Sequence, residues 1–216
     1  MTKQRGFFIT FEGTEGSGKS TQARLLAAWL RRKRLPVLAT HEPGGTDLGR
    51  AVRRILLHRR ALHITPLAEM ALFMASRAQL VEDVIMPSLR RGRVVICDRF
   101  LDSTLAYQGG GSHIDLALIR RLGAHVTRGA RPHLTFLLDI ETARGLRRLG
   151  RAHDRMEAKA RAYHERVRRQ YRALARAEPR RIIVLDATRP ISTLQRRIRR
   201  LIAQKMSLRH FVDNLA

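Results

Sequence analysis

The sequence has very little of what would mark a secreted or membrane protein. Its one cysteine, Cys97, can form no internal disulfide, which is typical of a reducing compartment. No apolar run approaches the roughly 20 residues that a transmembrane helix needs. Near the first residue, Lys3 and Arg5 lead directly into a predicted strand, without the apolar segment of a secretory signal. We therefore expect a cytoplasmic protein with no membrane partner.

Acidic residues are also scarce. Against 18 Asp and Glu there are 43 basic residues, of which five are lysine and 38 arginine, and the formal net charge is +25. Such a surplus is one mark of a nucleic-acid-binding protein. However, the arginines are spread along nearly every predicted helix, and aromatic residues, which stack on bases, make up only 5%. Because charge alone gives non-specific binding, and a genomic bias toward arginine explains the spread equally well, we do not expect a nucleic-acid partner.

Linkers, internal repeats and low-complexity stretches are absent as well. A chain of 216 residues without them predicts one domain, over residues 1–216, with a substantial core. Five apolar strands separated by helices are predicted at residues 7–11, 37–40, 94–97, 134–138 and 182–185. They indicate an α/β fold, a five-stranded parallel sheet with helices on both faces in a three-layer sandwich. Polar clusters follow the strands, where such sheets bind ligands.

A phosphate-binding loop follows the first predicted strand. Residues 13–20 match G-x-x-x-x-G-K-[ST] without a mismatch, and a helix is predicted after them, over residues 21–34. The glycines let backbone N–H groups point at phosphate oxygens, and the helix start adds its positive end. Lys19 is expected to reach the outer phosphates of a nucleoside triphosphate, and the Ser20 hydroxyl to ligate magnesium. The predicted nucleotide-binding residues are Gly13, Thr14, Glu15, Gly16, Ser17, Gly18, Lys19, Ser20 and Thr21.

An acid and a base directly follow the third predicted strand. Asp98 stands where P-loop proteins place the acid that holds magnesium, often through water, and Arg99 is placed to clamp a second phosphate. The alternative is a charged pair that only caps the strand, but the nearby phosphate loop favours function. Residues 102–104 are typical of a helix start, and residues 107–111, Tyr-Gln-Gly-Gly-Gly, of a mobile loop.

The helix predicted over residues 66–89 carries an arginine on its apolar stripe. Apolar side chains recur there at three- and four-residue spacing, and Arg77 falls on the same face, four residues after Phe73. A buried arginine must pair, snorkel or face a polar cavity. One interpretation is ordinary core, with Arg77 at the edge of the stripe. The other places Phe73 under a planar base whose edge Arg77 bonds.

Basic residues also follow the fourth predicted strand. Arg147, Arg151 and Arg155 lie four apart, and Arg148 is adjacent. Such a run is most often a solvated helix face. It also fits a mobile basic lid, around residues 144–156, whose arginines neutralise charge on a phosphoryl group in transfer. Because the phosphate loop itself contains no arginine, the lid is the favoured interpretation.

Six stretches together resemble a known family, and they occur in that family's order. They read FEGTEGSGKSTQ (11–22), EPGGT (42–46), FMASRAQ (73–79), CDRF (97–100), DSTLAYQG (102–109) and DRME (154–157). The chain resembles the bacterial thymidylate kinases. The resemblance implies the P-loop fold of nucleoside monophosphate kinases and transfer of the γ-phosphoryl group of ATP to dTMP, giving dTDP and ADP, with Mg²⁺ as cofactor. It also implies a homodimer, for which the helix over residues 66–89 is a candidate surface.

The resemblance further implies a substrate site. Phe73 would stack on thymine, with Arg77 and Thr104 bonding its edge. Glu15 would meet the 3′-hydroxyl of dTMP, and Arg99 its phosphate. Tyr107 would pack where a ribose 2′-hydroxyl would sit and so favour the deoxy sugar. The full set of expected substrate contacts is Glu15, Pro43, Phe73, Arg77, Arg99, Thr104, Tyr107 and Gln108.

Gly16 stands where some family members carry a phosphate-loop arginine, so the lid is expected to supply that charge. The resemblance points to Arg151, with Arg147, Arg148 or Arg155 as candidates, beside Lys19 and Arg99. His41, Arg50 and the pair Ser112–His113 depart from the family's usual residues, and residues from about 205 match nothing in it. Two alternatives remain, a P-loop kinase for AMP, UMP or GMP and a nucleic-acid-binding P-loop ATPase.

Overall fold

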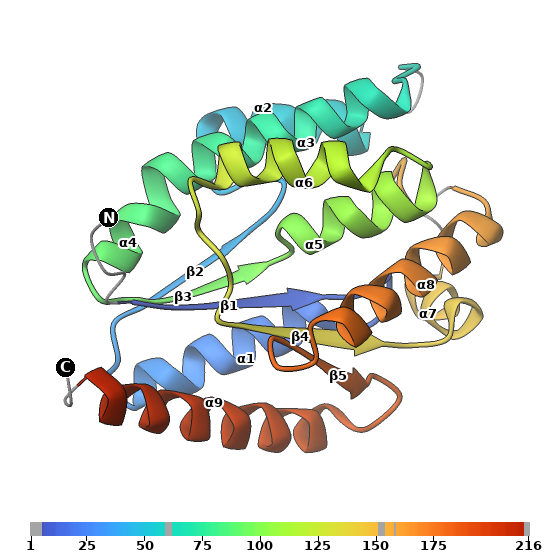
Figure 1. Cartoon of the computed structure of the whole chain (residues 1–216). Helices are drawn as coiled ribbons and strands as arrows, with labels where there is room; N and C mark the ends of the chain where they lie inside the picture. The colour runs from blue at the N-terminus through green and yellow to red at the C-terminus, as the bar shows by residue number, and fades with distance from the viewer. Residues whose placement is uncertain (1–5, 59–61, 151–153, 158, 214–216) are drawn as a thin grey trace.

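The computed structural model describes residues 6–58, 62–150, 154–157 and 159–213; Lys3, Arg5 and Arg151 lie outside these ranges. Its centre is a five-stranded, wholly parallel sheet in the order β2-β3-β1-β4-β5 (Figure 1). The strands are β1 (Phe7–Glu12), β2 (Val37–His41), β3 (Val94–Asp98), β4 (Leu134–Asp139) and β5 (Ile182–Asp186). All five predicted strands are present, and the expected α/β architecture is confirmed.

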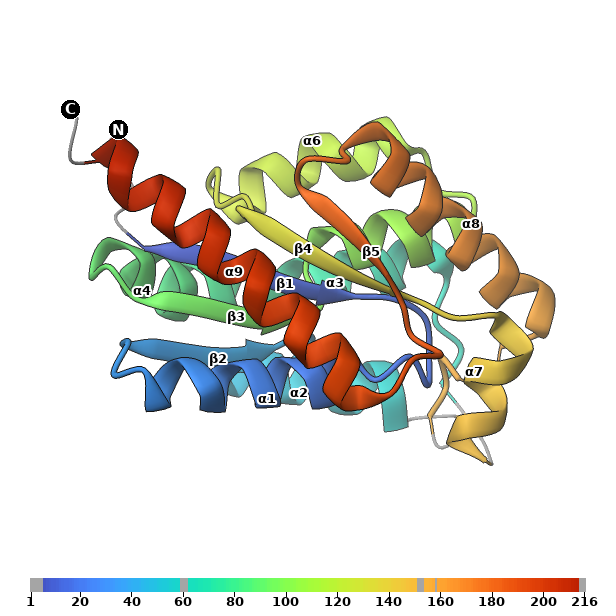
Figure 2. The same cartoon turned by 90° about the horizontal axis from the view of Figure 1, so that it is seen from below.

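Helices cover both faces of the sheet. On one face lie α1 (Lys19–Arg32) and α9 (Ile191–Asp213), seen side by side in Figure 2. The other face carries α2 (Asp47–Arg53), α3 (Pro66–Leu80), α4 (Met86–Arg90), α5 (Leu101–Thr104), α6 (Leu116–Thr127) and α8 (Arg161–Ala177). The short helix α7 (Thr142–Leu149) follows β4 at the carboxyl edge of the sheet.

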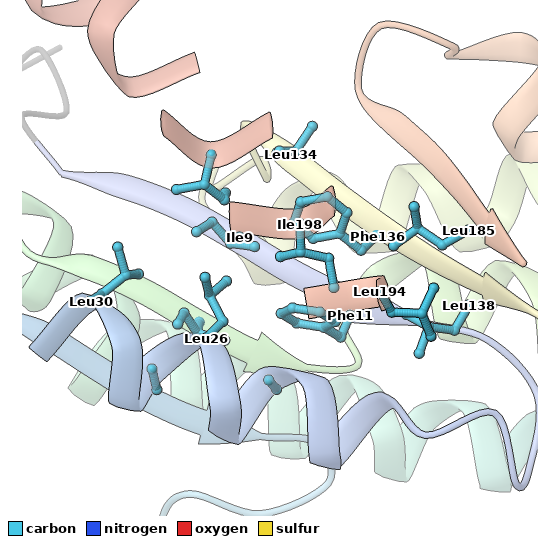
Figure 3. Packing of buried hydrophobic residues seen from close by; sticks show 14 of the residues in the cluster. Ile9, Phe11, Leu26, Leu30, Leu134, Phe136, Leu138, Leu185, Leu194 and Ile198 are labelled. Atoms are coloured by element: carbon cyan, nitrogen blue, oxygen red, sulfur yellow. The ribbon is translucent and has the colours of Figure 1, made fainter. Parts of the chain in front are cut away.

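One hydrophobic core lies between β1, β4 and the α1–α9 layer. Ile9, Phe11, Leu26 and Phe136 are fully buried there, and Ile198 brings α9 onto the same cluster (Figure 3). Apolar side chains on both faces of every central strand require this double cover. Burial of this much apolar surface is the main stabilising contribution to a rigid central sheet.

The register of the strands brings polar residues to one edge. Phe11 of β1 pairs with Asp98 of β3, and β4 ends beside β5 at the pair Asp139–Asp186. Because all five strands are parallel, the residues that follow them meet at the same edge. The phosphate loop, which lies between β1 and α1, is therefore held next to the end of β3.

One predicted loop is wrong. Residues 107–111 were expected to be a mobile loop, but they belong to the π-helical segment η3 (Leu105–Gly111), which continues α5 and is largely buried. The glycines there serve close packing against α8. A Cβ on Gly110 would lie 2.4 Å from Cβ of Gln170, and one on Gly111 would lie 2.6 Å from the Tyr163 ring.

The helix predicted over residues 66–89 is present but interrupted. A π-helical turn, η2 (Val81–Ile85), separates α3 from α4. Along this helical stretch, Met70 and Met74 join one core cluster, while Leu80 and Ile85 join another. A third π-helical segment, η1 (Arg54–His58), continues α2.

The segment from residue 205, left unassigned by the sequence, belongs to α9 as far as Asp213. Met206 of this helix packs against the core cluster under the sheet. Within the described residues, no helix is long and apolar enough to cross a membrane.

Candidate active site

The phosphate loop turns on glycines at positive φ. Gly13, Gly16 and Gly18 have φ of 139°, 65° and 89°, values that side chains rarely tolerate. Lys19 is buried, and its Nζ donates to the carbonyl oxygen of Thr14 (2.7 Å) and to Oγ of Ser17 (3.3 Å). Burial, with Arg99 nearby, lowers the pKa of Lys19 to about 8. The lysine thus rests on its own loop, where phosphate oxygens would replace a carbonyl.

Helix α7 lies directly on this loop. A Cβ on Gly16 would come 2.1 Å from the carbonyl oxygen of Gly145, and a Cβ on Gly145 would come 2.5 Å from that of Glu15. Arg148 of α7 donates to the carbonyl oxygens of Gly16 (3.3 Å) and Ala187 (3.0 Å). The backbone contact requires glycine at position 16, so an arginine is excluded there, while the helix that excludes it brings its own arginine to the loop.

Ser20 and Asp98 meet across the end of the sheet. The Ser20 hydroxyl donates to Oδ2 of Asp98, whereas Oδ1 of Asp98 is buried without a hydrogen-bond partner among the described residues. A hydroxyl and a carboxylate oxygen are ligands that Mg²⁺ accepts. The described residues contain no group of three or more His, Cys, Asp and Glu side chains suited to a metal ion. Magnesium here would therefore depend on phosphate oxygens as well.

Arg99 is held in a strained backbone conformation. Its φ is 74°, which costs a non-glycine residue about 1–3 kcal/mol. The guanidinium donates to the Gly13 carbonyl (3.2 Å), the Ser103 hydroxyl (3.2 Å) and the Tyr107 hydroxyl (3.0 Å). In this backbone conformation, the Arg99 side chain extends from the end of β3 toward the phosphate loop.

A cavity of about 650 Å³ joins these groups to the region beneath α3. All eight residues predicted to contact dTMP line it, although they come from the phosphate loop, the segment after β2, α3, the end of β3, α5 and η3. Six of the nine predicted nucleotide-binding residues line it too: Glu15, Gly16, Gly18, Lys19, Ser20 and Thr21. Gly13, Thr14 and Ser17 instead form the turn behind them.

Arg77 is paired inside the protein. It is 1% exposed, and it bonds Oε2 of Glu42 through Nε (2.8 Å) and Oγ1 of Thr104 through Nη1 (2.9 Å). A further bond reaches the carbonyl oxygen of Phe100 (3.1 Å). Phe73, one helical turn away, is half-buried at the cavity wall. Of the options that the sequence left open for a buried arginine, pairing and facing a cavity both occur.

The carboxylate of Glu15 lies between Tyr107 and Arg99. The Tyr107 hydroxyl donates to Oε1 (2.5 Å), and Nη2 of Arg99 is 3.6 Å from the same oxygen. The guanidinium also lies over the Tyr107 ring, 4.9 Å from its centroid. Burial raises the pKa of Tyr107, so its hydroxyl keeps its proton and remains a donor. An acid, a base and an aromatic ring thus share one corner of the cavity.

The arginines of the predicted lid have different surroundings in the structure. Arg155 pairs with the buried Glu69 and donates to the carbonyl oxygen of Leu56 (2.9 Å), and Gln108 donates to Glu69 from the other side (2.9 Å). Arg147 is exposed on α7. Arg151 lies outside the described residues. Among the described lid arginines, Arg148 is the one bonded to the phosphate loop.

Several carboxylates of the site were not singled out from the sequence. Glu42 and Glu69 stand in stretches with no local sign of a buried partner. Glu12 is fully buried and accepts from the Phe100 N–H (2.7 Å), the Ser103 hydroxyl (2.6 Å) and the Tyr171 hydroxyl (2.8 Å). Its signal in the sequence was its place at the end of a predicted strand, directly before the phosphate loop.

Comparison with known proteins places this chain in a family. The family model described as thymidylate kinase matches residues 11–198. The chain belongs to the thymidylate kinase family. It is 50% identical over 196 residues to the thymidylate kinase of Deinococcus radiodurans, covering 90% of this chain and 95% of that protein. The Roseiflexus sp. thymidylate kinase is 48% identical over 205 residues, 88% and 91% of the two chains.

A solved structure agrees with this assignment. The crystal structure of thymidylate kinase from Ehrlichia chaffeensis superposes with a TM-score of 0.75 at 34% identity, over 91% of this chain and 98% of that one. The family and the fold expected from the sequence are both confirmed. The expected enzyme class, an ATP-dependent phosphotransferase acting on dTMP, follows from membership of the thymidylate kinase family.

Proposed function

We propose that this cavity transfers the γ-phosphoryl group of ATP to dTMP, with the phosphate loop binding the donor and the region under α3 binding the acceptor. The observation that carries the proposal is that one cavity is lined both by six of the predicted nucleotide-binding residues and by the eight expected acceptor residues. ATP would lie along Lys19, Ser20 and Thr21. The thymine ring of dTMP would stack on Phe73 with its edge toward Arg77. Pro43 and Gln108 would complete the wall of the cavity around it.

The chemistry needs alignment and charge neutralisation. The attacking oxygen belongs to a phosphate monoester, whose second pKa is about 6, so the group is already largely ionised and no general base is required. Lys19, Arg99 and the loop N–H groups would stabilise the negative charge of the phosphoryl group in transfer. Some family members carry an arginine at the position of Gly16. Arg148, which donates to the Gly16 carbonyl oxygen, is our candidate for supplying that positive charge here.

The donor set at the end of β3 fits magnesium. Ser20 and Asp98 would hold the ion, and the unpartnered Oδ1 of Asp98 offers it, or a water bound to it, an acceptor. Mg²⁺ held by these residues would neutralise part of the phosphate charge.

Discrimination against ribonucleotides would rest on Tyr107. Its ring is 5% exposed and fixed by Glu15 and Arg99, so it cannot move aside for a 2′-hydroxyl. The edge of thymine would bond Arg77 and Thr104, both of which line the cavity while bonded to each other.

A substrate panel tests this function. Phosphorylation by ATP with magnesium is measured for dTMP, dUMP, UMP, AMP and GMP, with EDTA as a control. We expect a strong preference for dTMP and no turnover in EDTA. Preference for a ribonucleotide would overturn the acceptor assignments and leave the phosphate chemistry, and a folded, ATP-binding protein without any kinase activity would overturn both.

We also propose a cytoplasmic homodimer. Leu67 at the start of α3 is 57% exposed and Leu48 of α2 is 44% exposed, which makes this helical face a candidate surface. A cytoplasmic location is supported by the single buried cysteine and by substrates that are cytoplasmic nucleotides. Light scattering on the purified protein would give a mass near 49 kDa, twice that of the 24.7 kDa chain, for the dimer, and cell fractionation would test the location.

A further inference from the structure

Glu15 has only one of its two carboxylate oxygens held. Oε1 accepts from the Tyr107 hydroxyl (2.5 Å) and lies 3.6 Å from Arg99. Oε2 is buried and has no hydrogen-bond partner in the described part of the chain. Rotation about the last side-chain bond of a glutamate is soft, so a carboxylate fixed at one oxygen offers a substrate hydroxyl no set direction.

The side chain that faces Oε2 is His164, from α8. Its imidazole is fully buried, and Nδ1 lies 3.1 Å from Oε2. The direction of this contact does not yet make a hydrogen bond, and across the described residues neither ring nitrogen has a partner. Buried polar groups without partners are costly and therefore rare. Here three such atoms, two nitrogens and one oxygen, lie together behind the wall of the ligand cavity.

Packing places the ring beside Glu15. The neighbouring Tyr163 meets the imidazole edge-on, with ring centroids 5.5 Å apart, and its hydroxyl donates to the carbonyl oxygen of Tyr107 (3.0 Å). Helix α8 is thereby docked on η3, which carries the second partner of Glu15. Since Nδ1 is already within 3.1 Å of Oε2, a hydrogen bond between them would need a change in the direction of the N–H and no change in distance.

We propose that His164 is a positioning residue for the sugar hydroxyl of the acceptor: its Nδ1–H fixes Oε2 of Glu15 and so sets the angle at which the carboxylate meets the 3′-hydroxyl. The inference rests on the proposed function, in which Glu15 receives that hydroxyl. His164 does not line the cavity, whereas Glu15 does, so the effect must pass through the carboxylate. Burial raises the pKa of Glu15, but His164, Arg99 and Lys19 together lower it to about 2. The Glu15 carboxylate therefore stays ionised and can accept a hydrogen bond from the sugar hydroxyl.

The test compares dTMP with 3′-deoxy-dTMP, which lacks the hydroxyl, at saturating ATP and magnesium. His164→Phe keeps a ring and removes both nitrogens. We expect its KM for dTMP to rise about tenfold, the value of one hydrogen bond to a charged group. We expect kcat, and KM for 3′-deoxy-dTMP, to stay within about twofold of the wild type. His164→Asn, whose amide nitrogen can take the place of Nδ1, should restore most of the preference for dTMP.

Tyr163→Phe is the matched control, because it loosens α8 at the adjacent position without touching Glu15; any effect should be equal for the two nucleotides. If His164→Phe raises both KM values equally, or neither, the inference is overturned. Should that variant not fold, nitrogen-15 NMR of the wild type decides, since the inference requires a protonated Nδ1 and a bare Nδ1 contradicts it. A wild type that does not phosphorylate dTMP at all would overturn the proposed function instead.

Discussion

The cationic side chains at the two ends of the cavity have different kinds of hydrogen-bond partner. At the phosphate-loop end, Lys19 donates to the carbonyl oxygen of Thr14 and Arg148 to that of Gly16. At the acceptor end, Arg77 is paired with the buried carboxylate of Glu42. The cations at the phosphate-loop end thus donate to neutral carbonyl groups, whereas the cation at the acceptor end is paired with a charged carboxylate.

The difference would separate cations that are proposed to bind phosphate from cations whose buried pairing shapes the pocket. A triphosphate can displace a carbonyl because it offers a full negative charge in its place. It cannot as easily displace a buried carboxylate, since the carboxylate left behind would be unpaired in a low-dielectric interior. In the proposed function, Lys19 and Arg148 would therefore be available for transfer chemistry, whereas Arg77 would stay paired with Glu42 at the pocket wall.

Breaking the phosphate-loop end should give the largest effect. Lys19→Ala removes a cation that would act mainly on the phosphoryl group in transfer, so kcat is expected to fall at least about 10³-fold, or about 4 kcal/mol. The affinity for dTMP, measured by calorimetry, should largely survive, because the lysine serves the donor. Equal losses of turnover and of dTMP affinity would contradict the division between the two ends.

Breaking the acceptor end should act first on stability. Arg77→Met leaves Glu42 buried without its partner, which is expected to lower the free energy of unfolding by about 3 kcal/mol or more. Urea denaturation measures this loss. Adding Glu42→Gln to the variant should recover part of it.

The matched control for that loss is Arg161→Met in α8. Its pair with Glu165 is exposed, at 64% and 41% for the two side chains, and such pairs contribute about 0.5 kcal/mol or less. A similar loss from both variants would mean that burial of the charge pair is not what makes Arg77 important.

The same comparison explains what the sequence could predict. The phosphate loop is one continuous stretch whose backbone shape follows from its glycines, so its motif, strand and helix were all predicted correctly. The acceptor end is assembled from partners that are distant in the chain: Arg77 meets Glu42 35 residues away, and Glu15 meets His164 of α8. No periodicity within α3 or α8 reveals such pairs.

The misread glycine run has the same physical cause. Three glycines in a row favour a loop when only local conformational freedom is considered. In the fold, Gly110 and Gly111 instead leave space for Gln170 and Tyr163 of α8, a contact that depends on a segment about 60 residues further along the chain. Local patterns therefore predicted the sheet and the loop, but not the packing that assembles the acceptor pocket.

A variant of Arg148 tests the proposed role of the phosphate-loop end more specifically. Arg148→Ala should lower kcat about 10²-fold, as removal of one donor to a transition-state charge typically does, with a small change in KM for dTMP. The parallel variant Arg147→Ala tests the exposed neighbour on the same helix. A larger loss from Arg147→Ala would move the proposed role to that side chain and away from the arginine bonded to Gly16.

The last expected effect depends on pH and concerns Glu12, which joins the two ends. Burial, with Asp102 nearby, raises its pKa to about 7 from an ordinary value of 4.5. Between these two values the folded protein binds more protons than the unfolded chain, so stability should fall as pH rises from 4.5 to 7. One proton accounts for at most about 1.4 kcal/mol per pH unit.

Glu12→Gln keeps the shape of the protonated side chain and removes this titration. Urea denaturation at pH 5, 6 and 7 should therefore show a smaller loss of stability with rising pH in the variant than in the wild type. Glu15 cannot produce the same signal, because its pKa is lowered to about 2, so its contribution is lost only as pH falls below about 4.5. Parallel curves for the two proteins would contradict a raised pKa for Glu12. A difference confined to pH 4.5–7 would show that the carboxylate joining the loop to Phe100, Ser103 and Tyr171 is bound largely in its neutral form at low pH.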